Sequence, residues 1–143
     1  EFAMLKLYLD MEKTRWGDKL TIEIELAPEA ATQSIPPFLL LPLVENALKH
    51  GWQPGIRVLR LRLSARVEPP GTLVLVVANT GAWVEPGQSS APSTGIGLEN
   101  LRQRLRRYYP GAHEFTLEPI EGWVAARLAI RPHESRDSRI ENA

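Results

Sequence analysis

The chain has 143 residues and a mass of 16.0 kDa, which is the size of one domain with an ordinary hydrophobic core. It contains no cysteine, which excludes disulfide frameworks, thiolate metal sites and cysteine nucleophiles. Its 17 basic and 17 acidic residues cancel, and this balance argues against a general polyanion binder.

The first half of the chain alternates between helical and strand patterns. Residues 5–16 carry apolar side chains at helical spacing and predict a helix. Residues 19–26 alternate apolar and polar side chains, which is typical of a half-buried strand. Residues 34–51 are almost entirely apolar, and we expect there a buried helix that is kinked at Pro42.

The second half is richer in strands. Residues 56–67 alternate again, with arginines on the polar face, and 72–78 form a continuous apolar run typical of a central strand. A loop over 82–94, rich in Pro, Ser and Gly, precedes a helix that opens at Gly95. Two further strands follow over 113–118 and 123–130.

The mixture of elements lacks a strict βαβ order. We therefore predict an α+β fold, a two-layer sandwich in which helices cover one face of a mixed sheet.

Three features carry candidate chemistry, and the first is Asn46 on an otherwise apolar helix. Helical spacing places Lys49 and His50 on the same side, one turn further on. An amide oxygen beside cationic groups suits a magnesium-bound polyphosphate. The alternative is an asparagine that is satisfied within the core, with Lys49 and His50 complementing the helix dipole.

The second feature is Asn79-Thr80-Gly81 at the end of the central strand, where a side-chain oxygen could accept a hydrogen bond from a purine amine. The alternative is a plain turn. The third is Gly95-Ile96-Gly97, whose backbone N–H groups could approach phosphate at a helix N-terminus, or which could be a simple hinge. The phosphate-binding motif of P-loop proteins is absent.

In this order the features resemble the N box, G1 box, lid and G2 box of the GHKL (Bergerat) ATP-binding fold. Residues 43–51 read LVENALKHG and residues 95–105 read GIGLENLRQRL. Both look like the catalytic domain of LytS-type sensor histidine kinases. Residues 8–12 and 15–18 look like the segment that joins the dimerisation helices to this domain in that family. The resemblance spans about residues 5–131.

The resemblance implies ATP and Mg²⁺ as cofactors and assigns a role to each candidate residue. Asn46 would hold the Mg²⁺ and Lys49 would act with it in catalysis, with His50 also on the phosphate oxygens. Asn79 stands where the family often has an aspartate that reads the adenine amine, and Gly81 would allow close approach of the base. The closing lid and the phosphates would be held by Gly95, Ile96, Gly97 and Leu98.

Two departures from the family pattern bear on activity. Trp83 occupies the position of a second glycine of the G1 box. Pro42 occupies the position of the glutamate that activates water in GHKL hydrolases, which favours phosphoryl transfer over ATP hydrolysis. Two alternatives stay open: a nucleotide-sensing or protein-interaction module of this fold, and a GHKL ATPase. Nucleic-acid binding through the arginines of 102–107 is disfavoured.

None of the three histidines lies in the sequence context of a phosphoacceptor, so we expect a fragment of a longer protein. Residues 1–17 are expected to be a linker helix, with 1–4 compatible with a cloning remnant. Residues 18–131 are expected to be the catalytic domain and 132–143 a disordered tail. The resemblance implies a membrane-anchored bacterial homodimer with this domain in the cytoplasm. Its expected partners are its own dimerisation domain and a cognate response regulator.

Overall fold

The computed structural model describes residues 2–33, 35, 39–51, 57–81 and 96–132. Its helices are α1 (Phe2–Trp16), the 3-10 turn η1 (Gly17–Lys19), α2 (Pro28–Ala31), α3 (Leu41–Gly51) and α4 (Ile96–Tyr108). Its strands are β1 (Leu20–Leu26), β2 (Leu59–Glu68), β3 (Thr72–Thr80), β4 (His113–Ile120) and β5 (Trp123–Ile130).

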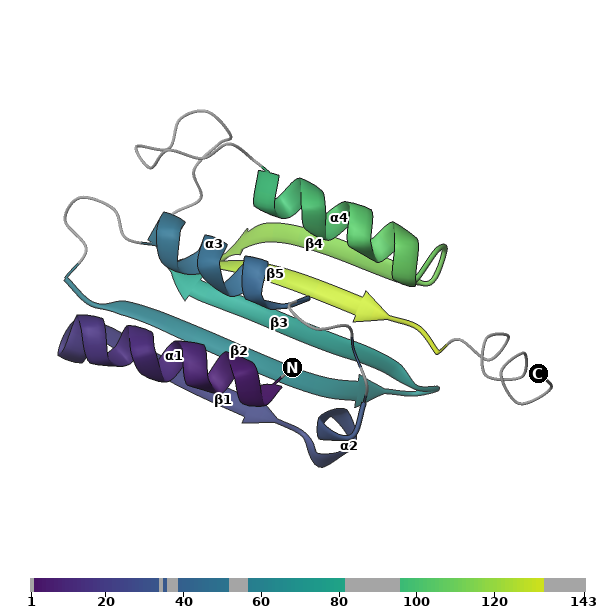
Figure 1. Ribbon diagram of the computed structural model, residues 1–143, viewed down its shortest axis with the longest axis horizontal. Helices are drawn as coiled ribbons and strands as arrows, with labels where there is room; N and C mark the ends of the chain where they lie inside the picture. Colours follow the sequence, from purple (N-terminus) through teal and green to yellow (C-terminus); the bar gives the residue numbers. More distant parts are fainter. Residues whose placement is uncertain (1, 34, 36–38, 52–56, 82–95, 133–143) are drawn as a thin grey trace.

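The five strands form one mixed sheet in the order β1-β2-β3-β5-β4 (Figure 1). β1 runs parallel to β2, and the other three pairs of neighbours are antiparallel. β3 is therefore central, and most of its side chains are buried on both faces. This confirms the central strand that the apolar run predicts.

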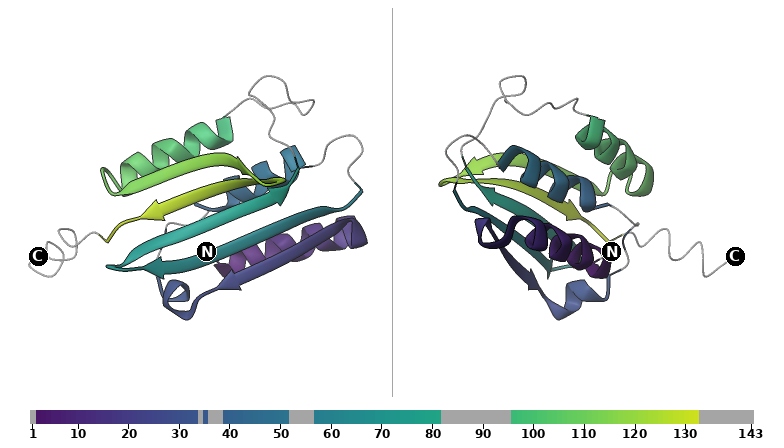
Figure 2. Two further views of the ribbon diagram at one scale, coloured as in Figure 1. Left: turned by 180° about the vertical axis from the view of Figure 1, so that it is seen from behind. Right: turned by 60° about the vertical axis from the view of Figure 1, so that its left-hand side comes forward.

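Helices α1, α3 and α4 lie on one face of the sheet, and among the described residues the opposite face carries no helix (Figure 2). The arrangement confirms the predicted two-layer α+β sandwich. Alternation along β2 sends Leu59, Leu61 and Leu63 to the helical layer, while Arg60 and Arg66 are exposed on the other side. The core lies between the sheet and the helices.

Helix α3 begins at Leu41, so the prediction of a helix from residue 34 with a kink at Pro42 is wrong. Residues 35, 39 and 40 are not helical. The Leu40 carbonyl accepts the backbone N–H groups of Leu43 (3.0 Å) and Val44 (3.1 Å), which starts the helix there. Pro42 is thus in the first turn, where its missing N–H costs no helical hydrogen bond.

Two other boundaries differ from the sequence-based expectation. The short helix α2, with Pro28 in its first turn, was not predicted. β3 continues past residue 78 and includes Asn79 and Thr80, which pair with β5. The loop over 82–94 and the tail from 133 onward lie outside the described residues. No helix in the described part is long and apolar enough to cross a membrane.

Candidate functional site

The C-terminus of α3 lies against the end of β3, and α4 begins at the same side of the molecule (Figure 1). α3 contacts both β3 and α4. The topology therefore brings together the segments that hold the Asn46, Asn79 and Gly95–Gly97 motifs, although Gly95 itself lies outside the described residues. The candidate residues therefore come from both the sheet and the helical layer that covers it.

Asn79 is the one polar side chain that is buried among the described residues, with 6% exposure. It lies two residues beyond Val77 and four beyond Leu75 along β3, so all three side chains point to the helix-covered face. Its Nδ2 donates a hydrogen bond to the Thr80 carbonyl at 3.1 Å. Within the described part of the chain, its Oδ1 accepts no hydrogen bond.

The orientation of the Asn79 amide follows from this hydrogen bond. A carbonyl oxygen can only accept, so the Thr80 carbonyl requires the NH₂ group rather than Oδ1 to face it. Among the described residues, Oδ1 is thereby left as an acceptor without a donor, in a buried position. Such an atom can accept a hydrogen bond from a donor group of a ligand.

Two glycines lie against the Asn79 amide. A Cβ atom on Gly51 would be 3.2 Å from Asn79 Nδ2 and 2.6 Å from Leu59 Cδ1. A Cβ atom on Gly81, whose φ is +138°, would be 3.9 Å from the same nitrogen. Gly51 thus lets the end of α3 approach β3 closely, and Gly81 adopts a backbone conformation that favours glycine.

The α3 candidates differ in their exposure. Asn46 is half-buried and Lys49 is exposed. No hydrogen bond of either side chain is found within the described residues. His50 is in α3, but its side chain lies outside the description. Of the α4 candidates, Ile96 and Gly97 form the start of the helix and Leu98 is half-buried.

Helix α1 lies near helix α3 (Figure 1). Burial, followed by the nearby carboxylates of Glu12 and Glu45, raises the pKa of the Tyr8 phenol. Glu45 directly precedes Asn46 in α3. The helix expected to link to a dimerisation domain therefore lies beside the Asn46 segment.

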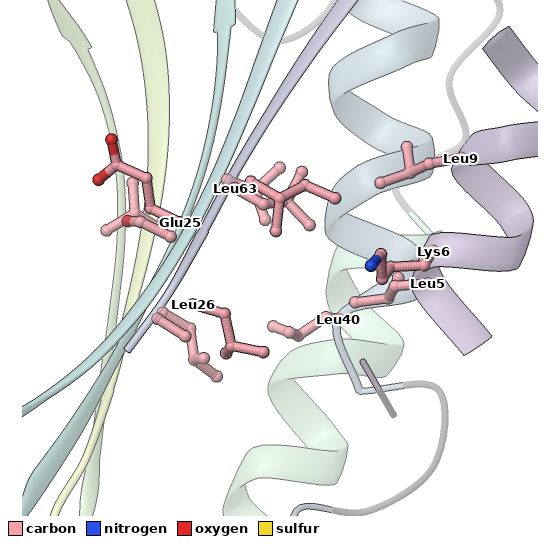
Figure 3. A pocket seen from close by; sticks show the side chains of 13 residues that line it. Leu5, Lys6, Leu9, Glu25, Leu26, Leu40 and Leu63 are labelled. Atoms are coloured by element: carbon pink, nitrogen blue, oxygen red, sulfur yellow. The ribbon is translucent and has the colours of Figure 1, made fainter. Parts of the chain in front are cut away.

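An apolar cavity of about 30 Å³ lies between α1 and the sheet (Figure 3). Leucines from α1, the sheet and the segment before α3 line it, among them Leu5, Leu9, Leu26, Leu40 and Leu63. It is separate from Asn79 and from the ends of α3 and β3. Lys6, Glu25 and Ser64 are also among the lining residues, but most of the lining is apolar, so we interpret the cavity as imperfect packing under α1.

Sequence reasoning missed the contact between Gly51 and Asn79 and the role of Thr80 as the partner of the Asn79 amide. Both depend on which strand and helix ends meet, which is a tertiary property. The glycine that closes the LVENALKHG segment was a signal for the first of them.

The fold is that of histidine kinase catalytic domains. The structure of the mycobacterial sensor histidine kinase MprB matches with a TM-score of 0.68 and 20% identity, covering 92% of this chain and 97% of that one. Full-length ShkA in complex with AMPPNP matches with a TM-score of 0.61 and 17% identity, covering 90% of this chain and 29% of that one.

Sequence similarity narrows the class further. The chain is 32% identical to the sensor protein LytS of Bacillus subtilis over 114 residues, which is 73% of this chain and 19% of LytS. A scan against models of protein families finds no match. The chain spans about a fifth of the length of the curated relatives it matches. It is a relative of the LytS-type sensor histidine kinases, which confirms the resemblance read from its motifs.

Proposed function

We propose that the chain is the ATP-binding catalytic domain of a sensor histidine kinase, which transfers the γ-phosphoryl group of ATP to a histidine on a dimerisation domain. The observation that carries the proposal is the buried Asn79 amide at the ends of α3 and β3, whose Oδ1 accepts no hydrogen bond from the residues that the structure describes. An unsatisfied buried polar atom costs about 1–3 kcal/mol, which a donating ligand would recover.

The exocyclic amine of adenine is a donor of the required kind. Asn79 would accept its hydrogen bond through Oδ1, and Gly81, where a Cβ atom would meet nothing nearer than Asn79 Nδ2 at 3.9 Å, leaves room on one side of the amide. Because Asn79 is uncharged, its hydrogen bond to the base is neutral, and such bonds are weaker than those of a carboxylate. We therefore expect moderate rather than tight nucleotide affinity.

The phosphates would lie between α3 and the start of α4. The amide oxygen of Asn46 suits Mg²⁺, and Lys49 and His50 would contact phosphate oxygens. Among the described residues, no group of three or more His, Asp or Glu side chains could hold a metal ion. The phosphate oxygens of the nucleotide would therefore supply the other ligands of the Mg²⁺. Bound Mg²⁺ would neutralise charge on the transferred group. The backbone N–H groups at the start of α4 would be provided by Gly95, Ile96, Gly97 and Leu98.

Transfer to a histidine is favoured over hydrolysis because α3 has no base at the appropriate turn. Pro42 is one turn before Asn46 and cannot accept a proton. Glu45 is exposed and, one residue from Asn46, lies about 100° around the helix. In this proposal the domain is cytoplasmic, within a membrane-anchored bacterial homodimer that phosphorylates a response regulator and binds no nucleic acid.

The test is phosphoryl transfer from γ-labelled ATP to the dimerisation domain of the full-length protein, added separately. We expect an acid-labile phosphohistidine on that domain, lost in Asn46→Ala and kept in Gln103→Ala, a change on the exposed side of α4. Nucleotide binding without any phosphohistidine would favour a sensing module. ATP turnover without transfer would favour an ATPase.

A further inference from the structure

The end of β3 is anchored on both sides. Leu61 and Asn79 form the last β2–β3 pair, and beyond it the backbone N–H of Arg60 donates to the hydroxyl of Thr80 at 3.0 Å. On the β5 side the N–H of Gly81 donates to the Gly122 carbonyl at 3.0 Å. The hydroxyl of Thr80 thus takes the place of a backbone acceptor at the point where β2 and β3 separate.

Thr80 connects the two faces of the sheet. Successive residues of a strand point to opposite faces, so its hydroxyl lies on the face without helices while Asn79 lies under α3. Its carbonyl accepts the hydrogen bond from Asn79 Nδ2. A hydroxyl on the bare face therefore holds the carbonyl that orients a buried amide on the other face.

The donor to that hydroxyl is itself held in place. Arg60 Nη2 pairs with Glu23 Oε1 at 2.9 Å, and its guanidinium lies 5.2 Å from the centre of the Trp123 ring. Trp123 is also the β5 residue that pairs with Thr80. Two strands and a stacked side chain thus fix the position of Thr80.

We propose that Thr80 is a positioning residue that sets the base preference of the site. It locks the Asn79 amide with Nδ2 on the Thr80 carbonyl, which leaves Oδ1 to face the base. The site then takes a purine with a 6-amino group and disfavours one with a 6-oxo group, which would place two oxygens face to face. With the amide reversed, Oδ1 would face the Thr80 carbonyl at 3.1 Å, an arrangement of two acceptors. This inference rests on the proposed nucleotide site.

The experiment measures dissociation constants for Mg-ATP and Mg-ITP by calorimetry on the whole chain. Wild type is expected to prefer ATP by about tenfold or more. Thr80→Val keeps the shape of the residue but removes the hydroxyl, and it should lower the ATP/ITP preference at least about threefold. Thr80→Ser keeps the hydroxyl and should retain the preference. A purely structural role would weaken both nucleotides equally.

Several outcomes overturn the inference. Equal binding of ATP and ITP by wild type would overturn the role of Thr80 but not the nucleotide site. An unchanged ATP/ITP preference in Thr80→Val would have the same meaning. Loss of the preference in Thr80→Ser would do the same. Binding of neither nucleotide would overturn the proposed function, and this inference with it.

A measurement on wild type covers the case in which Thr80→Val does not fold. One of the two Asn79 Nδ2 protons should be shifted and protected from exchange in NMR spectra, because it is hydrogen-bonded to the Thr80 carbonyl. Two protons that both exchange as fast as those of an exposed asparagine amide would contradict the locked amide.

Discussion

Gly51 leaves the space in which the Asn79 amide lies. In Gly51→Ala the new methyl group would be 2.6 Å from Leu59 Cδ1, and Leu59 is fully buried and cannot move away freely. We expect a loss of about 1–3 kcal/mol in the free energy of unfolding, because overpacking outweighs the gain in helix propensity. Urea unfolding measures it.

The matched control for that change is Lys49→Ala, at an exposed position of the same helix. Its effect on stability should stay within about 0.5 kcal/mol. A Gly51→Ala variant more stable than wild type would show that the end of α3 does not pack closely on β3.

Glu23 gives a pH-dependent prediction at the scale of one side chain. Hydrogen bonds from Arg60 and then Arg62 hold the pKa of the Glu23 carboxyl below its usual value. The folded state therefore favours the ionised form, and its stabilisation is present above the ordinary glutamate pKa and lost as the pH falls through the lowered one. Glu23→Gln should be less stable than wild type at pH 7, with the difference vanishing in acid.

Thermal unfolding between pH 7 and pH 2 measures this difference. Glu25→Gln is the control, since Glu25 lies on the same face of β1, is exposed and has no ion pair among those found in the described residues. A Glu23→Gln difference that grows toward acid pH would contradict the ion pairs with the two arginines.

The candidate residues divide by how local their signal is. Asn46 and Lys49 could be placed on one side of a helix from spacing alone, since four residues span about one turn. The burial of Asn79 and the contribution of Thr80 could not, because they depend on the pairing of β3 with β2 and β5 and on the approach of Gly51. The roles of the site residues stay predictions.

At the scale of elements, α1 belongs to the core through one of its faces. Leu9 is 2% exposed and packs on the sheet, whereas Leu7 on the same helix is 67% exposed. Leu9→Ala should lower the free energy of unfolding by about 2–5 kcal/mol, through lost burial and a cavity. Leu7→Ala should change it by no more than about 0.5 kcal/mol.

Denaturant unfolding of the two variants tests whether α1 docks in solution as it does in the structure. Equal, small effects would mean that α1 is detached from the sheet. In that case it would act only as a linker.

Strands were easier to predict than helix boundaries. The alternation in β2 reports a sheet with one buried and one polar face, and the leucines of that strand are buried. In the edge strand β1 the alternation predicts the strand but not its burial, because Ile24 and Leu26 are exposed. The start of α3 was harder, because an apolar run before Pro42 looks the same whether it is helical or extended. α2 has four residues, too few for a periodic pattern.

At the scale of the whole molecule, the zero net charge is accompanied by local pairs of opposite charge. The helix-free face carries Glu23, Arg60 and Arg62 in one cluster, with Arg62 4.5 Å from the Trp123 ring. The prediction that the arginines of 56–67 lie on a solvated sheet face is confirmed by the exposure of Arg60 and Arg66. The arginines Arg60 and Arg62 of this face are explained by their ion pairs with Glu23.

The measurement that tests the central claim most directly is calorimetric titration of the chain with ATP, with and without Mg²⁺, for wild type and Asn46→Ala. The account predicts binding that depends on magnesium and is weakened at least about tenfold in Asn46→Ala, with Gln103→Ala unchanged. No binding of Mg-ATP to the folded wild type would contradict the nucleotide site and reduce the kinase proposal to a likeness of fold.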